Sequence, residues 1–449
     1  MNNKKYKIAI IGAGITGLTA ALDITSKGHS VDLFESSNFI GGQASTFDVG
    51  GQPLERGYHH LFTSDKEIID LMNQLGIEDQ LLWPESSVGT FYQGKIFNFV
   101  TPMDLLKFTP LSFINRLRLG ITILLLQRIK KFSRLENVTA YNWLRKFCGK
   151  PSYDVFWKPM LRGKFGEKYY ERISMVWIWG KIQTRVKSRD KSMIRERLGY
   201  PRSSFKIIFD RLQTKIFEHG GEIHLNTKVE KICVDSSSEK VSGLVVSNDS
   251  KTQEFIEYDA VLSTTPSFIF KNLIPELPKN YILKLESIDY MSAVLLILIL
   301  DRPLTDKYWL NIADRSIPFV ALIEHTNLVP PDIYGGKHIV YLSNYLNTDD
   351  PMFKMNHKEL LNSYLPHIRK INPDFHPDWI EKTFHHKVGA AQPIIETNYR
   401  EKIVPHATPI RGVYLANTSQ IYPEDRGTNY GVKMGTRVAK MILKDLKTH

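Results

Sequence analysis

The stretch KIAIIGAGITGLTAALDITSKGHSVDLFESSNFIGG, residues 7–42, decides the fold of this chain. An apolar run from Lys7 to Ile11 is followed at once by a GxGxxG pattern, and Leu18 to Ile24 then repeats apolar residues at helical spacing. Residues 30–34 alternate as a second strand, and Glu35 stands at its end. This order of strand, tight glycine turn, helix and strand is typical of a dinucleotide-binding unit built on a parallel sheet.

Each glycine of the turn has a physical role. Gly12 allows the backbone to reverse, Gly14 lacks the Cβ that would keep a pyrophosphate from the helix N-terminus, and Gly17 lets helix and strand pack closely. Glu35, about 20 residues beyond the glycines, can accept hydrogen bonds from the hydroxyls of an adenosine ribose. We therefore predict that the turn binds a dinucleotide through Gly12, Ala13, Gly14, Ile15, Thr16 and Gly17.

A glycine pair, Gly41 and Gly42, extends this pattern. With it, the stretch resembles the fingerprint of FAD-dependent enzymes of the flavin amine oxidase, protoporphyrinogen oxidase and carotenoid desaturase superfamily, so we expect FAD rather than NAD. The resemblance implies an α/β fold, with a discontinuous Rossmann-like FAD-binding domain and an inserted α+β substrate domain. The family usually places Arg or Lys after the glycine pair. Here Gln43 follows, which can donate only neutral hydrogen bonds.

The same resemblance implies further cofactor contacts along the chain. In the family, a backbone group at the position of Val229 meets the adenine, and an acid at the position of Asn417 bonds the ribityl chain. An amide at Asn417 can still accept from a hydroxyl, although without charge. A helix start that points at the flavin is expected next. The remaining residues expected at the cofactor are Gly57 and, at that helix start, Gly427, Asn429, Tyr430 and Gly431.

Length and composition set wide limits. A chain of 449 residues is long enough for a flavin domain and a substrate domain. Its two cysteines, Cys148 and Cys233, form no CxxC motif or Cys/His cluster, so we expect no metal, no disulfide framework and a reducing, cytoplasmic setting. No apolar run approaches the roughly 18 residues that span a bilayer.

The net charge of +12 is concentrated in one region. Residues 103–215 contain 26 Lys or Arg and 8 Asp or Glu, so the rest of the chain is net acidic. Such an excess suits nucleic acid, a membrane surface or an anionic substrate. No RNA-binding motif accompanies it, and a flavin fold argues against nucleic acid. The apolar and basic segment 103–132 either lies peripherally on an anionic membrane or forms a substrate-domain helix with a solvated basic face.

The resemblance covers almost the entire chain and places cofactor motifs at both of its ends. We therefore expect the FAD-binding domain to comprise residues 1–90, 200–268 and 385–449. The substrate domain is expected to comprise residues 91–199 and 269–384. Sequence patterns predict the following elements: a helix at 64–75 with Ser64 as its N-cap, a hairpin at 91–99, a helix at 205–219, strands at 290–300, 317–325 and 338–345, and a helix at 355–371. The oligomeric state is left open.

Candidate catalytic residues come from three places. His59 and His60 lie in LERGYHHLF, residues 54–62, which is similar to a segment beside the flavin of UDP-galactopyranose mutases. A histidine pair is more often structural, but this one is expected near the cofactor. Arg162 and Lys164 are candidates for binding an anionic group of the substrate, although a solvated ion pair is the more ordinary role of either. Tyr430 completes the set.

These features lead to one main functional hypothesis and three alternatives. We expect hydride transfer between FAD and a lipophilic or amphipathic small molecule, isoprenoid-like, carotenoid-like or tetrapyrrole-like, in a pocket formed by residues 103–200. One alternative is a flavin-dependent sugar-nucleotide mutase, motivated by the histidines and the basic residues. A second is an amine oxidase. The third is a flavin-binding protein without catalysis, suggested by Gln43 and Asn417 where charged residues are usual.

Overall fold

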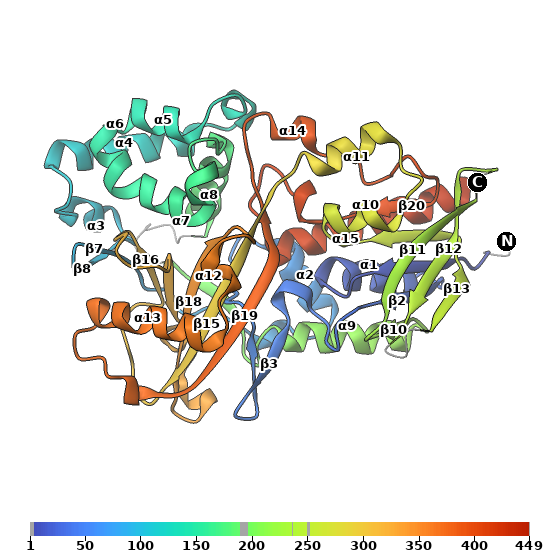
Figure 1. The fold of residues 1–449 in the computed structure, drawn as a ribbon, viewed down its shortest axis with the longest axis horizontal. Coiled ribbons are helices and arrows are strands. Elements are labelled where there is room, and N and C mark those ends of the chain that lie inside the picture. Colours follow the sequence, from blue (N-terminus) through green and yellow to red (C-terminus); the bar gives the residue numbers. More distant parts are fainter. Residues whose placement is uncertain (1–3, 189–195, 236, 249–251, 449) are drawn as a thin grey trace.

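The computed structural model describes residues 4–188, 196–235, 237–248 and 252–448. A parallel sheet with its helices lies at one end of the molecule, and a larger mixed sheet and a group of helices lie at the other (Figure 1). This mixed α/β architecture confirms the predicted fold class.

The parallel sheet has the strand order β10-β2-β1-β14-β20, and all its neighbours pair in parallel. Its strands are β1 (Lys7–Ile11), β2 (Ser30–Phe34), β10 (Glu222–His224), β14 (Ala260–Ser263) and β20 (Val413–Leu415). The predicted first and second strands are therefore confirmed residue for residue. The outer strand β20 comes from the far end of the chain, so both ends of the sequence contribute to one sheet.

Alternate residues of β1 face two different layers. Ile8 and Ile10 belong to the large core that includes three helices, α1 (Ile15–Thr25), α9 (Lys206–Glu218) and α15 (Thr428–Thr448). Ala9 and Ile11 point into a second core on the other face. That core is covered by the antiparallel strands β11 (Lys228–Asp235), β12 (Lys240–Ser247) and β13 (Gln253–Glu257), with α10 (Ser267–Leu273) and α11 (Lys279–Glu286). Both faces of the sheet are thus buried, as parallel sheets require.

The larger sheet has the order β19-β15-β18-β17-β16-β7-β8. Its pairs are antiparallel except for β16 with β7. Its strands are β7 (Val88–Tyr92), β8 (Lys95–Asn98), β15 (Tyr290–Leu300), β16 (Trp309–Ile312), β17 (Ala321–Glu324), β18 (His338–Leu346) and β19 (Ile380–Pro393). The apolar run of β15 is buried from residue 291 to 300, because it lies between β19 and β18 and is covered on both faces. One cover is α13 (His357–Ile371), with α12 (Pro351–Lys354) nearby (Figure 1).

Six helices form a separate group at one end of the molecule (Figure 1). They are α3 (Pro102–Lys107), α4 (Phe113–Arg128), α5 (Ala140–Phe147), α6 (Gly149–Ser152), α7 (Lys158–Tyr169) and α8 (Met175–Lys187). Within the described residues, no helix combines the length and the apolar character that crossing a bilayer needs.

Short elements connect these parts. They are the hairpin β3 (Thr46–Val49) and β4 (Gln52–Glu55), the small strands β5 (Leu61–Phe62), β6 (Leu81–Leu82) and β9 (Leu198–Pro201), and the helices α2 (Lys66–Gln74) and α14 (Tyr399–Lys402). The prediction that Ser64 caps α2 was wrong. Asp65 occupies the N-cap position, and its carboxylate accepts from the backbone of Phe62 instead of capping the helix.

All four of the expected domain limits fall inside elements of secondary structure. The limit after residue 90 divides β7, the limit before residue 200 divides β9, and the limit before residue 385 divides β19. The limit after residue 268 divides α10. The strands β7 and β19 belong wholly to the larger sheet, whereas β9 pairs with β5 and β6.

Candidate cofactor and substrate site

The glycine turn follows β1 directly and has the backbone shape that the sequence predicts. Gly12 has a φ of +104°, in the region that favours glycine. A Cβ on Gly17 would lie 2.1 Å from the carbonyl oxygen of Gly12, so any larger residue would push α1 away from the sheet. The turn is closed from the side by Thr264, whose hydroxyl donates to the carbonyl of Ile11 at 2.9 Å.

The N-terminus of α1 opens beside the second glycine pair. Gly14 is the N-cap residue, and no side chain caps the helix. Gly42 lies close to Gly14, since a Cβ on Gly42 would stand 3.1 Å from the Cα of Gly14. A Cβ on Gly14 would meet no protein atom nearer than 4.0 Å. The first turn of α1 therefore presents backbone N–H groups and the positive helix end next to glycine backbone, which suits an anion.

Glu35 lies against the same turn. One carboxylate oxygen accepts from the backbone N–H of Ala13 at 2.9 Å, and the other accepts from that of Ser37 at 2.9 Å. The oxygen that accepts from Ala13 keeps a further lone pair for a ligand hydroxyl, whereas the other oxygen also accepts from the hydroxyl of Ser36 at 3.4 Å. The carboxylate is thus held in place by the chain before any ribose arrives.

The helix from the far end of the chain starts beside the same turn. A Cβ on Gly431 would lie 2.6 Å from Ile15, and one on Gly435 would lie 2.5 Å from the carbonyl oxygen of Thr16. Only glycine permits this close packing of α15 on α1. The structure therefore brings the start of α15, at Thr428, to the start of α1, and the two positive helix ends lie together.

These features fit FAD. The uncapped α1, the glycine cradle at Gly14 and Gly42, and the held carboxylate of Glu35 would take the pyrophosphate and the adenosine ribose. Val229 lies buried in β11, where its backbone is the part available for an adenine. The start of α15 would face the flavin.

Other residues predicted at the cofactor have partners within the protein. The amide oxygen of Asn417 accepts from the backbone and the hydroxyl of Ser419, at 3.0 and 2.6 Å, and its amide nitrogen donates to the carbonyl of Thr265. Both lone pairs of that oxygen are therefore used, which leaves none for the expected ribityl contact. Gln43 donates to the carbonyl of Ala390 at 2.8 Å.

The predicted residues around the start of α15 take different positions. Asn429 is buried, and its side chain accepts from the backbone N–H of Ile68 at 3.1 Å, so it joins α15 to α2. Gly427 is exposed just before the helix, and Tyr430 is half-buried on its first turn. Gly57 lies next to Leu295 of β15, and its carbonyl accepts from Nδ1 of His59 at 2.6 Å.

Burial keeps both predicted histidines uncharged. It lowers the pKa of His59 to about 4 and that of His60 to about 3, with the charge of Arg426 adding to the effect at His59. The Nδ1 atom of His60 lies 2.9 Å from the hydroxyl of Tyr308. Neutral imidazoles of this kind can orient a ligand or pass a proton, but they do not supply positive charge.

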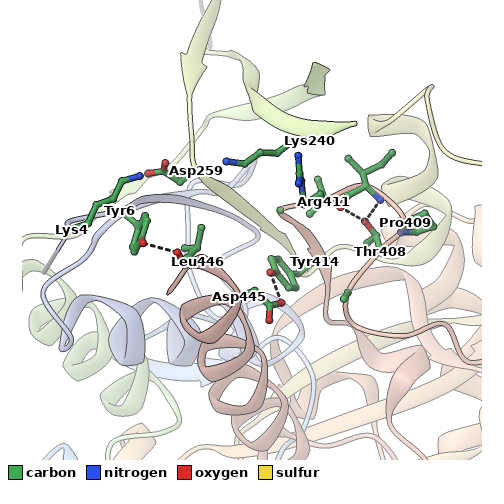
Figure 2. Close-up of a pocket in the computed structure, with 14 residues that line it drawn as sticks. Lys4, Tyr6, Lys240, Asp259, Thr408, Pro409, Arg411, Tyr414, Asp445 and Leu446 are labelled. Atoms are coloured by element: carbon green, nitrogen blue, oxygen red, sulfur yellow. Dashed lines mark hydrogen bonds between the residues drawn. The ribbon is translucent and has the colours of Figure 1, made fainter. Parts of the chain in front are cut away.

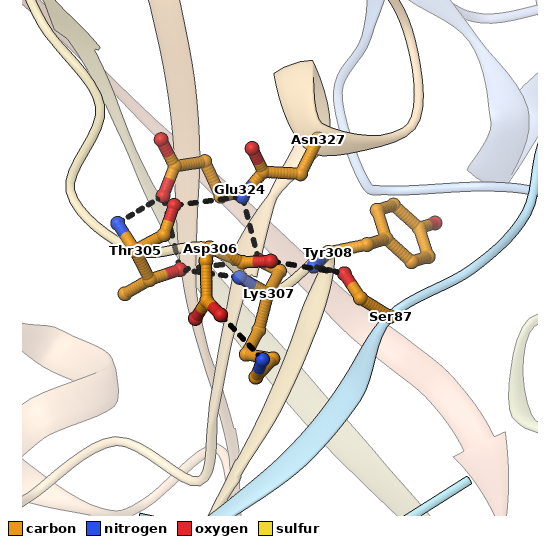
Figure 3. A network of polar contacts seen from close by, with 7 residues as sticks. All are labelled: Ser87, Thr305, Asp306, Lys307, Tyr308, Glu324 and Asn327. Carbon is orange, nitrogen blue, oxygen red and sulfur yellow. Dashed lines mark hydrogen bonds and ion pairs between the residues drawn. The ribbon is translucent and has the colours of Figure 1, made fainter. Parts of the chain in front are cut away.

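Tyr308 is itself held by a polar network in the turn that precedes β16. Figure 3 shows Thr305 donating to the carboxylate of Glu324, while Asn327 donates to the carbonyls of Thr305 and Lys307. The hydroxyl of Ser87 accepts from the backbone N–H of Tyr308 at 2.8 Å. The position of His60 therefore depends on a network whose residues 305–327 lie more than 200 residues away in the sequence.

Six polar side chains form what we call the cationic cluster, at the junction of the helical group, β18 and the start of α15. Arg426 donates to the hydroxyl of Tyr345 at 3.2 Å, and the hydroxyls of Tyr58 and Tyr345 lie 3.3 Å apart. The ammonium of Lys164 lies 3.8 Å from the ring centre of Tyr345. The members of the cluster are Tyr58, Lys164, Lys181, Tyr345, Asp425 and Arg426.

The charges within this cluster shift one another's pKa. Burial lowers the pKa of Lys164 to about 8. Burial would raise the pKa of Tyr345, but the charges of Lys164 and Arg426 outweigh it and lower the value to about 7. Burial would likewise raise the pKa of Asp425, but the charges of Lys181 and Arg426 lower it to about 2. Lys181 forms an ion pair with Asp425. Perturbed groups gathered in this way are typical of functional sites.

Arg162 does not join the cationic cluster. Its guanidinium pairs with Glu167 and lies 5.2 Å from the ring centre of Tyr170. It lines a separate surface pocket of about 360 Å³ with Asp154, Lys158 and other residues. Of the two cations predicted to bind an anionic group, the structure brings only Lys164 to the start of α15.

A larger pocket of about 440 Å³ lies at the opposite edge of the parallel sheet, between the two ends of the described chain (Figure 2). Tyr6 donates to the carbonyl of Leu446 at 2.6 Å there, and Tyr414 donates to Asp445. The pocket adjoins the residues that precede β1 and β14, whereas the glycine turn follows the carboxyl end of β1. Because ligands of such sheets bind at the carboxyl ends of the strands, this pocket is not the cofactor site.

Sequence reasoning missed five members of the cationic cluster: Tyr58, Lys181, Tyr345, Asp425 and Arg426. A signal was present for the last two, since an Asp-Arg pair stands directly before Gly427, the residue that precedes α15. Tyr58 and Tyr345 gave no such signal, because a tyrosine beside a strand is most often part of a core.

Three comparisons place this geometry among known proteins. Over 305 residues the chain is 27% identical to a zeta-carotene desaturase of Solanum lycopersicum, a match that covers 61% of this chain and 50% of the relative. The match thus spans about half the length of that relative. An oxidoreductase of Methanosarcina mazei superimposes with a TM-score of 0.73 at 18% identity, over 97% of this chain and 100% of that structure.

A reduced UDP-galactopyranose mutase superimposes equally well, with a TM-score of 0.73 at 17% identity, over 98% of this chain and 96% of that structure. At such identities, structural likeness shows a shared fold. The family model described as flavin containing amine oxidoreductase matches residues 15–443. That match contains the starts of α1 and α15 and the cationic cluster. The flavin is FAD, as the sequence predicts. The chain therefore belongs to the flavin containing amine oxidoreductase family.

Proposed function

We propose that this protein is an FAD-dependent oxidoreductase that transfers a hydride between the cofactor and a lipophilic or amphipathic small molecule. The observation that carries the proposal is the meeting of α1 and α15, whose N-termini lie together beside the glycine cradle. The desaturase relatives act, by their names, on carotenes, which supports an isoprenoid-like substrate. We also propose a two-domain division with limits at the ends of β7 and β19 rather than within them.

The chain's own residues would bind and orient the reactants. When bound, FAD supplies the ring that exchanges a hydride with the substrate. The start of α15 would offset negative charge that develops on the cofactor, because its free N–H groups and helix dipole lie there. His59 and His60, being neutral, would shape the site without adding charge. The cationic cluster would contact the substrate beside Gly427.

Anaerobic mixing of the purified holoenzyme with a substrate panel tests this proposal. The panel contains an isoprenoid, a tetrapyrrole, an amine and a sugar nucleotide, and the readout is the flavin absorbance near its visible maximum. We expect bleaching by an isoprenoid or a tetrapyrrole. Bleaching by the amine alone would identify an amine oxidase. Protection of the reduced protein from thermal unfolding by the sugar nucleotide alone would favour a mutase. FAD that photoreduces normally and responds to no ligand would indicate a protein without catalysis.

We further propose that the helical group contacts an anionic membrane. One face of α4 exposes large apolar side chains, among them Ile114 at 76%, Ile121 at 58% and Leu124 at 54% exposure. Exposed basic residues flank this face: Lys107, Arg128, Lys130 and Lys131. An apolar face with a cationic rim suits the interface of a bilayer with anionic headgroups.

Co-sedimentation with vesicles tests the membrane contact. We expect binding to phosphatidylglycerol vesicles and little binding to phosphatidylcholine vesicles. Leu124→Asp should abolish it, whereas Leu283→Asp, at a leucine 66% exposed on α11, should not. Equal binding of both variants would contradict the proposal. If Leu124→Asp instead converts a dimer to a monomer without affecting vesicle binding, this face is an interface between two copies.

A further inference from the structure

Two cations of the cationic cluster form no ion pair with a carboxylate among the described residues, although the charge of Asp425 acts on both. Lys181 forms the ion pair with Asp425, whereas Lys164 and Arg426 form no such pair within the part of the chain that the structure describes. Arg426 uses one N–H group on the hydroxyl of Tyr345, and its buried Nε has no acceptor among the residues that the structure describes. A guanidinium has five donors, so most of the hydrogen-bonding capacity of Arg426 is unused.

Such an excess of positive charge is costly inside a protein. A buried cation is stabilised by a counterion or by hydrogen bonds, and an arginine cannot escape the cost by losing its proton. Lys164 and Arg426 lie deep in the molecule, yet both keep part of their surface accessible. A ligand atom can therefore reach them, and the oxygen atoms of an anion would satisfy the free donors.

We propose that Lys164 and Arg426 bind an anionic head group, a carboxylate or a phosphate, on the lipophilic substrate. This inference rests on the proposed function for the lipophilic part alone. A guanidinium presents paired donors that match the oxygens of carboxylate and phosphate. The hydroxyls of Tyr58 and Tyr345 stand beside it, and because one of them donates to the other, one proton of the protonated pair is left to bond the anion. A neutral hydrocarbon such as a carotene offers no group for these donors.

The position of Arg426 gives the head group a role in catalysis. Arg426 stands directly before Gly427 and α15, whereas Lys164 lies on α7, and both contact Tyr345. An anion bound by both cations would be held from two elements, next to the helix start assigned to the cofactor. Anchoring one end of a flexible substrate restricts where its reacting bond can lie, which is how binding energy is used for orientation.

Equilibrium binding to the oxidised holoenzyme tests the proposal without turnover. The ligands are geranic acid, geranyl phosphate and geraniol, which share one chain and differ in the head group, with calorimetry and the flavin difference spectrum as readouts. We expect one of the two anions to bind at least tenfold tighter than geraniol. The anion that binds tighter shows whether the head group is a carboxylate or a phosphate. Lys164→Met and Arg426→Met should weaken that anion at least tenfold and leave geraniol unchanged. Lys168→Met, at an exposed lysine on the same helix, is the matched control.

Several outcomes would overturn the inference. They are equal affinity for geraniol and both anions, an unchanged preference in the two variants, or loss of FAD from the variants in place of loss of anion affinity. Tighter binding of UDP-glucose than of either geranyl anion would also overturn it. If a methionine variant does not fold, Arg426→Lys replaces it, and its anion affinity should be intermediate. Selective anion binding without any flavin bleaching would uphold this inference while refuting the proposed redox function.

Discussion

Replacing Gly435 by alanine should weaken FAD binding through the packing of two helices. The new Cβ would lie 2.5 Å from the carbonyl oxygen of Thr16, 3.0 Å from the Cβ of Thr19 and 3.3 Å from the backbone nitrogen of Ala20. Two of these atoms belong to the backbone of α1 and cannot rotate away. The helices must therefore separate near their N-termini, where the cofactor is expected.

The size of the effect follows from two opposing contributions. Overpacking against backbone costs about 3 kcal/mol, at the upper end of the usual range. Alanine offsets about 1 kcal/mol of this cost, because its helix propensity is higher than that of glycine. If binding of FAD requires the close arrangement of the helices, the binding free energy becomes about 2 kcal/mol less favourable. The dissociation constant of FAD then rises roughly 30-fold.

Fluorescence titration of the apoprotein with FAD measures this change. Gly120→Ala is the matched control, because Gly120 is a helical glycine of α4 whose Cβ would make ordinary contact, 3.4 Å from Leu105. We expect Gly120→Ala to leave FAD affinity unchanged and to stabilise the fold by up to about 1 kcal/mol. An affinity of Gly435→Ala within twofold of the wild type would refute the reasoning that the two helix ends build one site.

Three further predictions concern individual side chains. Glu35→Gln removes charge-assisted hydrogen bonds of about 1.5–3 kcal/mol each, so FAD affinity should fall roughly 10- to 100-fold in the same titration; an unchanged affinity would mean that the carboxylate only braces the turn. Tyr308→Phe leaves Nδ1 of His60 buried without its partner and should cost about 1–3 kcal/mol in urea unfolding. The control Tyr281→Phe should cost little, because the hydroxyl of Tyr281 has no hydrogen-bond partner to lose among the described residues. Since the pKa values of His59 and His60 are lowered from 6.5 to about 4 and about 3, their stabilising contribution is present above pH 6.5 and is lost as the pH falls toward these values. His60→Phe should flatten that part of the urea stability profile, and an unchanged slope would show that His60 does not contribute to it.

Sequence alone predicted the parts of the fold that local pattern decides. The strand of β1, the glycine turn and the position of α15 each depend on spacing within about 30 residues, and each agrees with the structure. The predicted start of α2 does not agree with the structure. Asp65 occupies the N-cap position in place of Ser64, and its carboxylate accepts from the backbone N–H of Phe62. One hydrogen bond chosen by tertiary context decided that difference.

The candidate site was predicted on its cofactor side and largely missed on its substrate side. A dinucleotide is recognised by backbone at glycines, which leave a pattern in the sequence. The cationic cluster instead brings single residues from α7, α8, β18 and two loops to one place. No spacing links Tyr345 to Arg426, so only the packing of the larger sheet against the start of α15 could reveal that they are neighbours. Arg162 and Lys164 have similar sequence contexts, but tertiary packing places only Lys164 in the cationic cluster.

The position of β1 in its sheet has a consequence for biosynthesis. Ribosomes complete β1 and β2 first, but the strand on the other side of β1, β14, follows some 250 residues later, and β20 and α15 come later still. The nascent chain therefore carries an unpaired strand edge during most of its translation. A polypeptide that terminates prematurely before Thr428 lacks one wall of the cofactor site, so acquisition of the yellow prosthetic group would report that synthesis has passed this helix.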